Sequence, residues 1–100
     1  MYELFFTPQA DNDLRELESN PSNKRTLKAV RKTLGFMETN LKHPSLQTHE
    51  FQFLKGPNEE KVFEAYAQQN TPGAYRIFWY YGPNKKEITI VAIVAITPHP

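Results

Sequence analysis

The sequence contains no cysteine, only four glycines and no long hydrophobic run. The absence of cysteine excludes disulfides, thiolate metal sites and cysteine nucleophiles. The longest apolar stretch, residues 88–96, is interrupted by Thr89 and is far shorter than a membrane-spanning helix. The first residues lack the basic segment of a secretory signal. We therefore expect a cytoplasmic protein without a membrane partner.

Several familiar catalytic patterns are also missing. There is no glycine-rich phosphate loop, Ser-His-Asp order or paired-carboxylate signature. No HxxxH or HExxH spacing is present, so we predict no metal site and no cofactor. Twelve Lys and Arg against eleven Asp and Glu give a net charge of +1, which is not that of a strongly basic nucleic-acid binder. A role with nucleic acid would have to come from uneven placement of charge.

The length and composition predict one domain over residues 1–100, since 39% of the residues are hydrophobic. Residues 2–6 have the composition of a strand. A helix is predicted to follow, with Thr7 as its N-cap and Pro8 as its first residue. A second helix follows with an apolar stripe at helical spacing and ends before Pro44. Together, the two helices predict an αα-hairpin.

The second half of the chain changes to the pattern of strands. Short turns separate three strand-like segments, which are residues 51–53, 62–67 and 75–81. Short connections between consecutive strands favour an antiparallel meander. The near-continuous apolar run at 88–96 predicts a central strand, and residues 2–6 an edge strand. The sequence thus predicts an α+β fold, with two N-terminal helices packed on a mostly antiparallel sheet of four to five strands.

Arg76 lies in an aromatic strand, where a permanent charge is costly to bury unless it is paired or exposed in a cleft. One reading is an ion pair with Glu64, placed directly opposite by the hairpin. The other is a fork that binds a phosphate. Composition alone favours the ion pair.

Histidine is the side chain best suited to acid–base work near neutral pH. His43 is predicted to be an exposed loop residue. His49, with Glu50 beside it, lies in a loop just before a strand, and His99 follows the last strand. For each lone histidine a plain surface role is the simpler interpretation.

The second helix carries a basic stripe beside its apolar one, formed by Lys24, Arg25, Lys28, Arg31 and Lys32. Such a stripe suits a phosphate backbone. A solvated helix face is the commoner explanation of a charge run like this. Spacing alone leaves the function open.

The order of elements and several short motifs resemble the RelE/ParE superfamily of toxins from bacterial type II toxin–antitoxin systems. The resemblance covers nearly the whole chain. Its motifs are Thr7-Pro8, Leu41-Lys42-His43-Pro44, Phe53-Leu54-Lys55-Gly56, Val62-Phe63-Glu64-Ala65-Tyr66, Tyr75-Arg76-Ile77-Phe78-Trp79 and Ile96-Thr97-Pro98-His99-Pro100.

The resemblance implies two helices packed on an antiparallel sheet, a cognate antitoxin as partner, and in many members metal-independent cleavage of mRNA on the ribosome. It implies Arg76 as the phosphate clamp, Glu50 or His49 as the base and His99 as the acid. For such a function we predict as RNA-binding residues four cations of the basic stripe, Lys24, Lys28, Arg31 and Lys32, together with Lys55. A homodimer is a further expectation.

Two other functions fit the same resemblance. ParE-like members are similar in fold but inhibit DNA gyrase without a catalytic set. A catalytically inactive binding module that still holds an antitoxin is the third reading. Fold alone does not choose among them.

Overall fold

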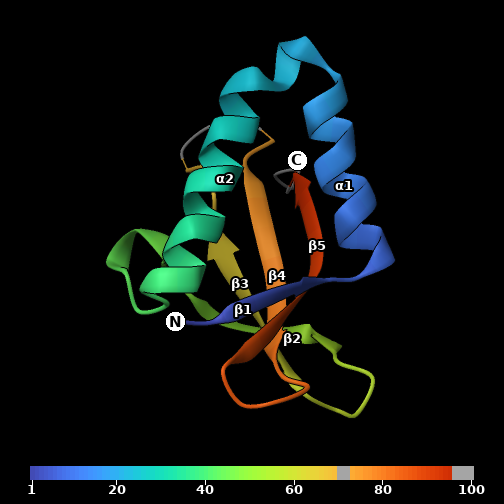
Figure 1. The fold of residues 1–100 in the computed structure, drawn as a ribbon, viewed down its shortest axis with the longest axis vertical. Helices are drawn as coiled ribbons and strands as arrows, with labels where there is room; N and C mark the ends of the chain where they lie inside the picture. The colour runs from blue at the N-terminus through green and yellow to red at the C-terminus, as the bar shows by residue number, and fades with distance from the viewer. Residues whose placement is uncertain (70–72, 96–100) are drawn as a thin grey trace.

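The structure, a computed structural model, describes residues 1–69 and 73–95. The helices and strands follow one another as β1 (Glu3–Phe6), α1 (Pro8–Ser19), the 3-10 turn η1 (Pro21–Asn23), α2 (Lys24–Thr39), the 3-10 turn η2 (Pro44–Leu46), β2 (His49–Lys55), β3 (Lys61–Tyr66), β4 (Tyr75–Tyr81) and β5 (Glu87–Ala95). Figure 1 shows α1 and α2 meeting through η1 at the top of the view.

The five strands form one sheet in the order β1-β5-β4-β3-β2. β1 pairs with β5 in parallel, and the other neighbours are antiparallel. The predicted α+β fold is therefore confirmed, with β1 as an edge strand and β5 as an interior one. β2 begins at His49, two residues earlier than its apolar alternation indicates, because His49 and Glu50 already pair with β3.

The helices have the local chemistry that the sequence predicts. The Thr7 hydroxyl accepts a hydrogen bond from the Ala10 N–H at 3.1 Å, and Pro8 occupies the first turn of α1. α2 buries Val30, Leu34 and Met37 along one face. In the described ranges, neither helix is long and apolar enough to cross a membrane.

The two faces of the sheet differ in what covers them. One face packs against both helices and forms the main core, in which Ile77, Trp79 and Ile90 are almost fully buried. The opposite face, here called the open face, has a smaller apolar cluster of Val62, Phe78 and Tyr80. Because side chains alternate along β4, Arg76 shares the open face with Phe78 and Tyr80.

α1 also closes the edge of β5 where the short strand β1 has ended. The Thr7 hydroxyl donates to the Val91 carbonyl at 2.8 Å, and the Asp13 carboxylate accepts from the Ile93 N–H at 2.9 Å. Asp13 is buried, and its other oxygen accepts from the Gln9 side-chain amide at 2.7 Å. A helix side chain thus satisfies a strand N–H that would otherwise lie unpaired in the core.

We expect Asp13→Ala to lower the free energy of unfolding by about 1–3 kcal/mol, since it leaves the buried Ile93 N–H without its acceptor. Asp11→Ala is the matched control on the same helix, because Asp11 forms only an exposed pair with Arg15. Its effect should stay below about 1 kcal/mol. Urea denaturation of the two variants measures both, and equal losses would contradict this role of Asp13.

Candidate active site on the open face

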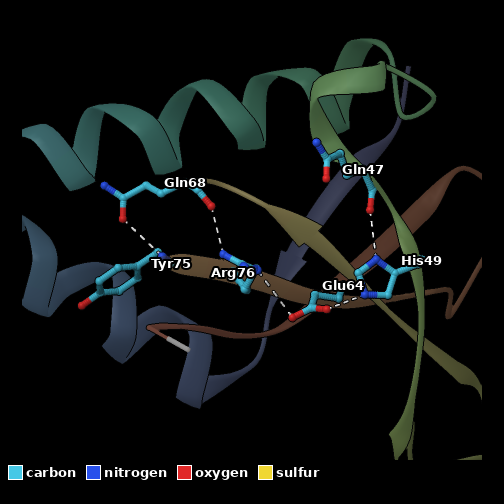
Figure 2. A network of polar contacts seen from close by, with 6 residues as sticks. All are labelled: Gln47, His49, Glu64, Gln68, Tyr75 and Arg76. Carbon is cyan, nitrogen blue, oxygen red and sulfur yellow. Dashed lines mark hydrogen bonds and ion pairs between the residues drawn. The ribbon is translucent and has the colours of Figure 1, made fainter. Parts of the chain in front are cut away.

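Three strands bring a histidine, a carboxylate and a guanidinium together on the open face. His49 on β2 lies directly opposite Glu64 on β3, and its Nε2 is 2.6 Å from Oε1 of the carboxylate. Oε2 of the same carboxylate is 3.7 Å from Nε of Arg76 on β4. Figure 2 shows Glu64 between the other two side chains. The Glu64 side chain is only 10% exposed, whereas the His49 side chain is 48% exposed.

The predicted pair between Glu64 and Arg76 exists, but the predicted register is wrong by two residues. Tyr66 lies directly opposite Arg76, and Phe78 lies opposite Glu64. The N–H groups of both Ala67 and Gln68 donate to the Tyr75 carbonyl, which sets this end of the hairpin. The ion pair is therefore diagonal, a separation that long side chains can span.

The Arg76 guanidinium has three kinds of neighbour. Nη1 donates to the Gln68 carbonyl at 2.9 Å, and the carbon at the centre of the guanidinium lies 3.8 Å from the Tyr66 ring centroid. The contact with Glu64 is longer than the usual 2.7–2.9 Å of a charge-assisted hydrogen bond. Arg76 is thus oriented firmly by Gln68 and Tyr66, and more weakly by the carboxylate.

Both ring nitrogens of His49 are engaged. Nδ1 lies 3.0 Å from the Gln47 carbonyl, which can only accept, so Nδ1 carries a proton. The contact between Nε2 and Glu64 then requires a second proton, shared between the imidazole and the carboxylate. His49 and Glu64 therefore form a hydrogen-bonded acid–base pair beside Arg76.

The other predicted catalytic residues do not join this cluster. Glu50 lies opposite Phe63, whose ring stacks on Trp79 in the main core, so the Glu50 side chain is directed to the helix-covered face. Its carboxylate is 3.9 Å from the Lys61 ammonium. His99 lies outside the described residues.

His43, predicted to be an exposed loop residue, is half-buried instead. Its ring stacks on Phe36, with centroids 3.9 Å apart. Nδ1 accepts a hydrogen bond from the Ser45 N–H at 3.1 Å, which stabilises the turn after α2. This histidine therefore has a local structural role.

The predicted RNA-binding cations are all exposed: Lys24, Lys28, Arg31 and Lys32 on α2, and Lys55 at the end of β2. Arg31 is paired with Glu18 across the two helices at 3.0 Å. A cavity of about 320 Å³ beside β3 is lined by Lys32 together with Tyr66 and Gln68. The basic face of α2 thus adjoins two residues that contact Arg76.

Among the described residues, no group of three or more His, Cys, Asp or Glu side chains could hold a metal ion. A guanidinium that can bind a phosphate beside a carboxylate–imidazole pair suits phosphoryl transfer by acid–base catalysis.

Three residues of the site were not predicted from the sequence to act in catalysis or binding: Glu64, Tyr66 and Gln68. A signal for two of them exists in the sequence. Glu64 is a lone acid in the apolar run 62–67, and alternation places Tyr66 on the same face of the strand. The contribution of the Gln68 backbone carbonyl has no signal in the side-chain pattern.

Comparison with known proteins finds structures of similar fold but no match by sequence. No protein-family model matches the sequence, and a search of curated proteins finds no match either. Among solved structures, the fold is similar to a YoeB/ParE toxin from Agrobacterium tumefaciens, with a TM-score of 0.68 and 9% identity. That match covers 96% of this chain and 99% of the other.

Two further structures agree. The YoeB dimer from Staphylococcus aureus has a TM-score of 0.62 and 17% identity, covering 95% of this chain and 97% of that one. The archaeal RelE–RelB complex from Pyrococcus horikoshii OT3 has a TM-score of 0.62 and 16% identity, covering 94% and 93%. The chain therefore has the fold of the RelE/ParE superfamily of toxins, as its sequence motifs predict.

A double-mutant cycle tests the close pair on the open face. We expect His49→Ala and Glu64→Gln to show a coupling free energy of about 1–3 kcal/mol at pH 6, because the two groups share a short hydrogen bond at a buried carboxylate. The adjacent pair of Glu50 and Lys61 is the control, since it is longer and more exposed. Its coupling should be below about 0.5 kcal/mol in the same urea titrations. Similar couplings in both cycles would contradict the geometry.

Proposed function

We propose that this protein is the toxin of a type II toxin–antitoxin pair and that it cleaves mRNA on the ribosome without a metal ion. Two independent observations support the proposal. The fold is that of RelE/ParE-superfamily toxins. Arg76, which the resemblance of the sequence motifs implies as the phosphate clamp, lies on the open face beside a carboxylate–imidazole pair.

The orientation of Arg76 is the observation that carries the proposal. Gln68 and Tyr66 hold the guanidinium, yet its ion pair with Glu64 is long. A phosphate can form shorter, charge-assisted hydrogen bonds with the same fork, which presents five N–H donors. Arg76 would then stabilise the negative charge that grows on the phosphorus oxygens during cleavage.

The remaining parts of the reaction follow from the same chemistry. A base removes the proton of the ribose 2′-hydroxyl, and an acid protonates the departing 5′-oxygen. Among the residues predicted for these steps, His49 lies in the cluster that contains Arg76, linked to it through Glu64, and His99 remains the proposed acid. The exposed cations of α2 would guide the negatively charged RNA toward the site.

The proposed partners are the ribosome with its mRNA and a cognate antitoxin. One structural neighbour is a RelE–RelB complex and another is a YoeB dimer. By analogy with their folds, we propose an antitoxin for this chain and a homodimer as a further assembly. Both proposals fit a protein of the cytoplasm, where ribosomes translate mRNA.

Arg76→Ala should lower the rate of mRNA cleavage by about 100-fold or more, because it removes the cation that faces the phosphate. The assay is induced expression in a bacterial host, followed by growth measurement and primer extension on an abundant message. Arg15→Ala, on the exposed side of α1, is a control that should behave like the wild type.

The same assay separates the competing functions. Growth arrest with new 5′ ends inside translated codons supports the nuclease. Arrest with intact message and DNA-damage signalling would contradict it and favour a gyrase inhibitor. A soluble, folded protein that causes no arrest would favour a binding module.

The basic face of α2 makes a prediction about salt. Lys28→Gln with Lys32→Gln should weaken ribosome binding and lower the slope of log affinity against log salt by about 1–2, since each lost phosphate contact removes about 0.7–0.9. Lys85→Gln with Lys86→Gln, in the turn before β5, removes the same charge at another place and should leave the slope unchanged. Binding is measured by sedimentation with ribosomes at several salt concentrations. Equal effects of the two double variants would exclude a specific basic face.

A further inference from the structure

We propose that Glu64 is the general base of the RNA-cleaving reaction and that His49 is its positioning residue. The inference rests on the proposed function, and it reassigns the base from the neighbouring pair of His49 and Glu50. It follows from which face of the sheet each carboxylate occupies and from how the His49 ring is bound.

Glu64 lies where the base of this reaction is needed. Glu64 Oε2 lies 3.7 Å from Nε of Arg76, so a phosphate bound by that guanidinium would lie directly beside the carboxylate. In RNA the 2′-hydroxyl is next to the 3′-phosphate, which brings its proton to the same place. Glu50 cannot take this role from the helix-covered face, where it lies opposite Phe63 and near Lys61.

The hydrogen bonds of His49 supply the second argument. A histidine acts as a base through a ring nitrogen that has a free lone pair. In this structure Nδ1 is directed to the Gln47 carbonyl and Nε2 to the Glu64 carboxylate. Neither nitrogen is available to a ribose hydroxyl. The imidazole instead orients the carboxylate, as a hydrogen-bonded partner in a fixed position does.

The surroundings of Glu64 are consistent with a reacting group. Among the described residues, His49 from β2 and Arg76 from β4 are the charged or titratable side chains paired with it, and Tyr66, on the same face of its own strand, contacts both of them. The carboxylate is largely buried, which strengthens its electrostatic interactions with a bound substrate. Its backbone is fixed inside a paired strand between β2 and β4.

The reaction balances as an internal transesterification. The Glu64 carboxylate takes the 2′-hydroxyl proton, and the 2′-oxygen forms a bond to phosphorus. The bond between phosphorus and the 5′-oxygen breaks, and its electron pair leaves on that oxygen. The 5′-oxygen is protonated by His99, the acid of the proposed function, or by solvent water. The products are a 2′,3′-cyclic phosphate and a 5′-hydroxyl end.

Single-turnover cleavage of mRNA on programmed ribosomes tests the assignment with the purified full-length chain. We expect Glu64→Gln, which keeps the size and polarity of the side chain, to lower the rate by about 100-fold or more. Glu50→Gln is the matched control and should stay within about twofold of the wild type. Melting temperatures confirm that the variants are folded.

The pH dependence distinguishes a base from a structural residue. In the wild type the rate should rise with pH on the acidic side, because the base must lose its proton before it can act. Glu64→Gln should abolish this rise in its residual activity. His49→Gln should lower the cleavage rate about tenfold. The rate of this variant should still rise with pH on the acidic side, because Glu64 remains as the base.

The outcomes separate the two proposals. A wild-type protein that cleaves mRNA, with Glu64→Gln within about threefold of it, would overturn the base assignment and leave the proposed function intact. A wild type that cleaves no mRNA on ribosomes would overturn both. Should Glu64→Gln fail to fold, His49→Gln decides, because loss of the acidic rise in that variant would make His49 the base.

Discussion

The Glu64 carboxylate, held between an imidazole and a guanidinium, is the interaction on which the open face of this protein depends. A buried carboxylate is stable only when its charge is compensated and its oxygens accept hydrogen bonds. His49 and Arg76 provide that compensation from the two neighbouring strands. The same contacts align three side chains from β2, β3 and β4, so the pairing of the strands and the geometry of the candidate site are inseparable.

Both helices pack on the other face of the sheet. In the cluster on the open face, the His49 side chain is 48% exposed, and those of Glu64 and Arg76 are 10% and 16% exposed. Thr7 and Asp13 bind α1 to the backbone of β5, which fixes the helix pair over the main core. Beside this cluster on the open face lies the buried apolar cluster of Val62, Phe78 and Tyr80.

Much of the architecture could be predicted from the sequence, because hydrophobic spacing and capping residues are local. Thr7-Pro8 marked the start of α1, and the apolar run at 88–96 indicated an interior strand. The site was harder. Arg76 is a candidate from its strand and motif alone, but the proposed role of Glu64 depends on strand register. A hairpin register is determined by the closing turn, and the sequence does not specify how that turn closes.

The placement of Glu50 illustrates the same limit. It is adjacent to His49 in the chain, so the sequence treats the two as equivalent candidates for the base. Once the segment pairs as a strand, adjacent residues face opposite sides of the sheet, and of the two only His49 shares the open face with Arg76. Residue types near a motif can thus be recognised from the sequence, whereas their separation onto two faces requires the structure.

The proposed reaction activates a ribose 2′-hydroxyl on the open face against the adjacent phosphate. The most direct measurement is the chemistry of the RNA ends, determined by mass spectrometry of fragments released from ribosomes by the purified protein. Attack by the 2′-hydroxyl should leave a 2′,3′-cyclic phosphate on the upstream fragment and a 5′-hydroxyl on the downstream one. A 3′-hydroxyl with a 5′-phosphate would mean that water attacked the phosphate, and it would exclude the proposed reaction.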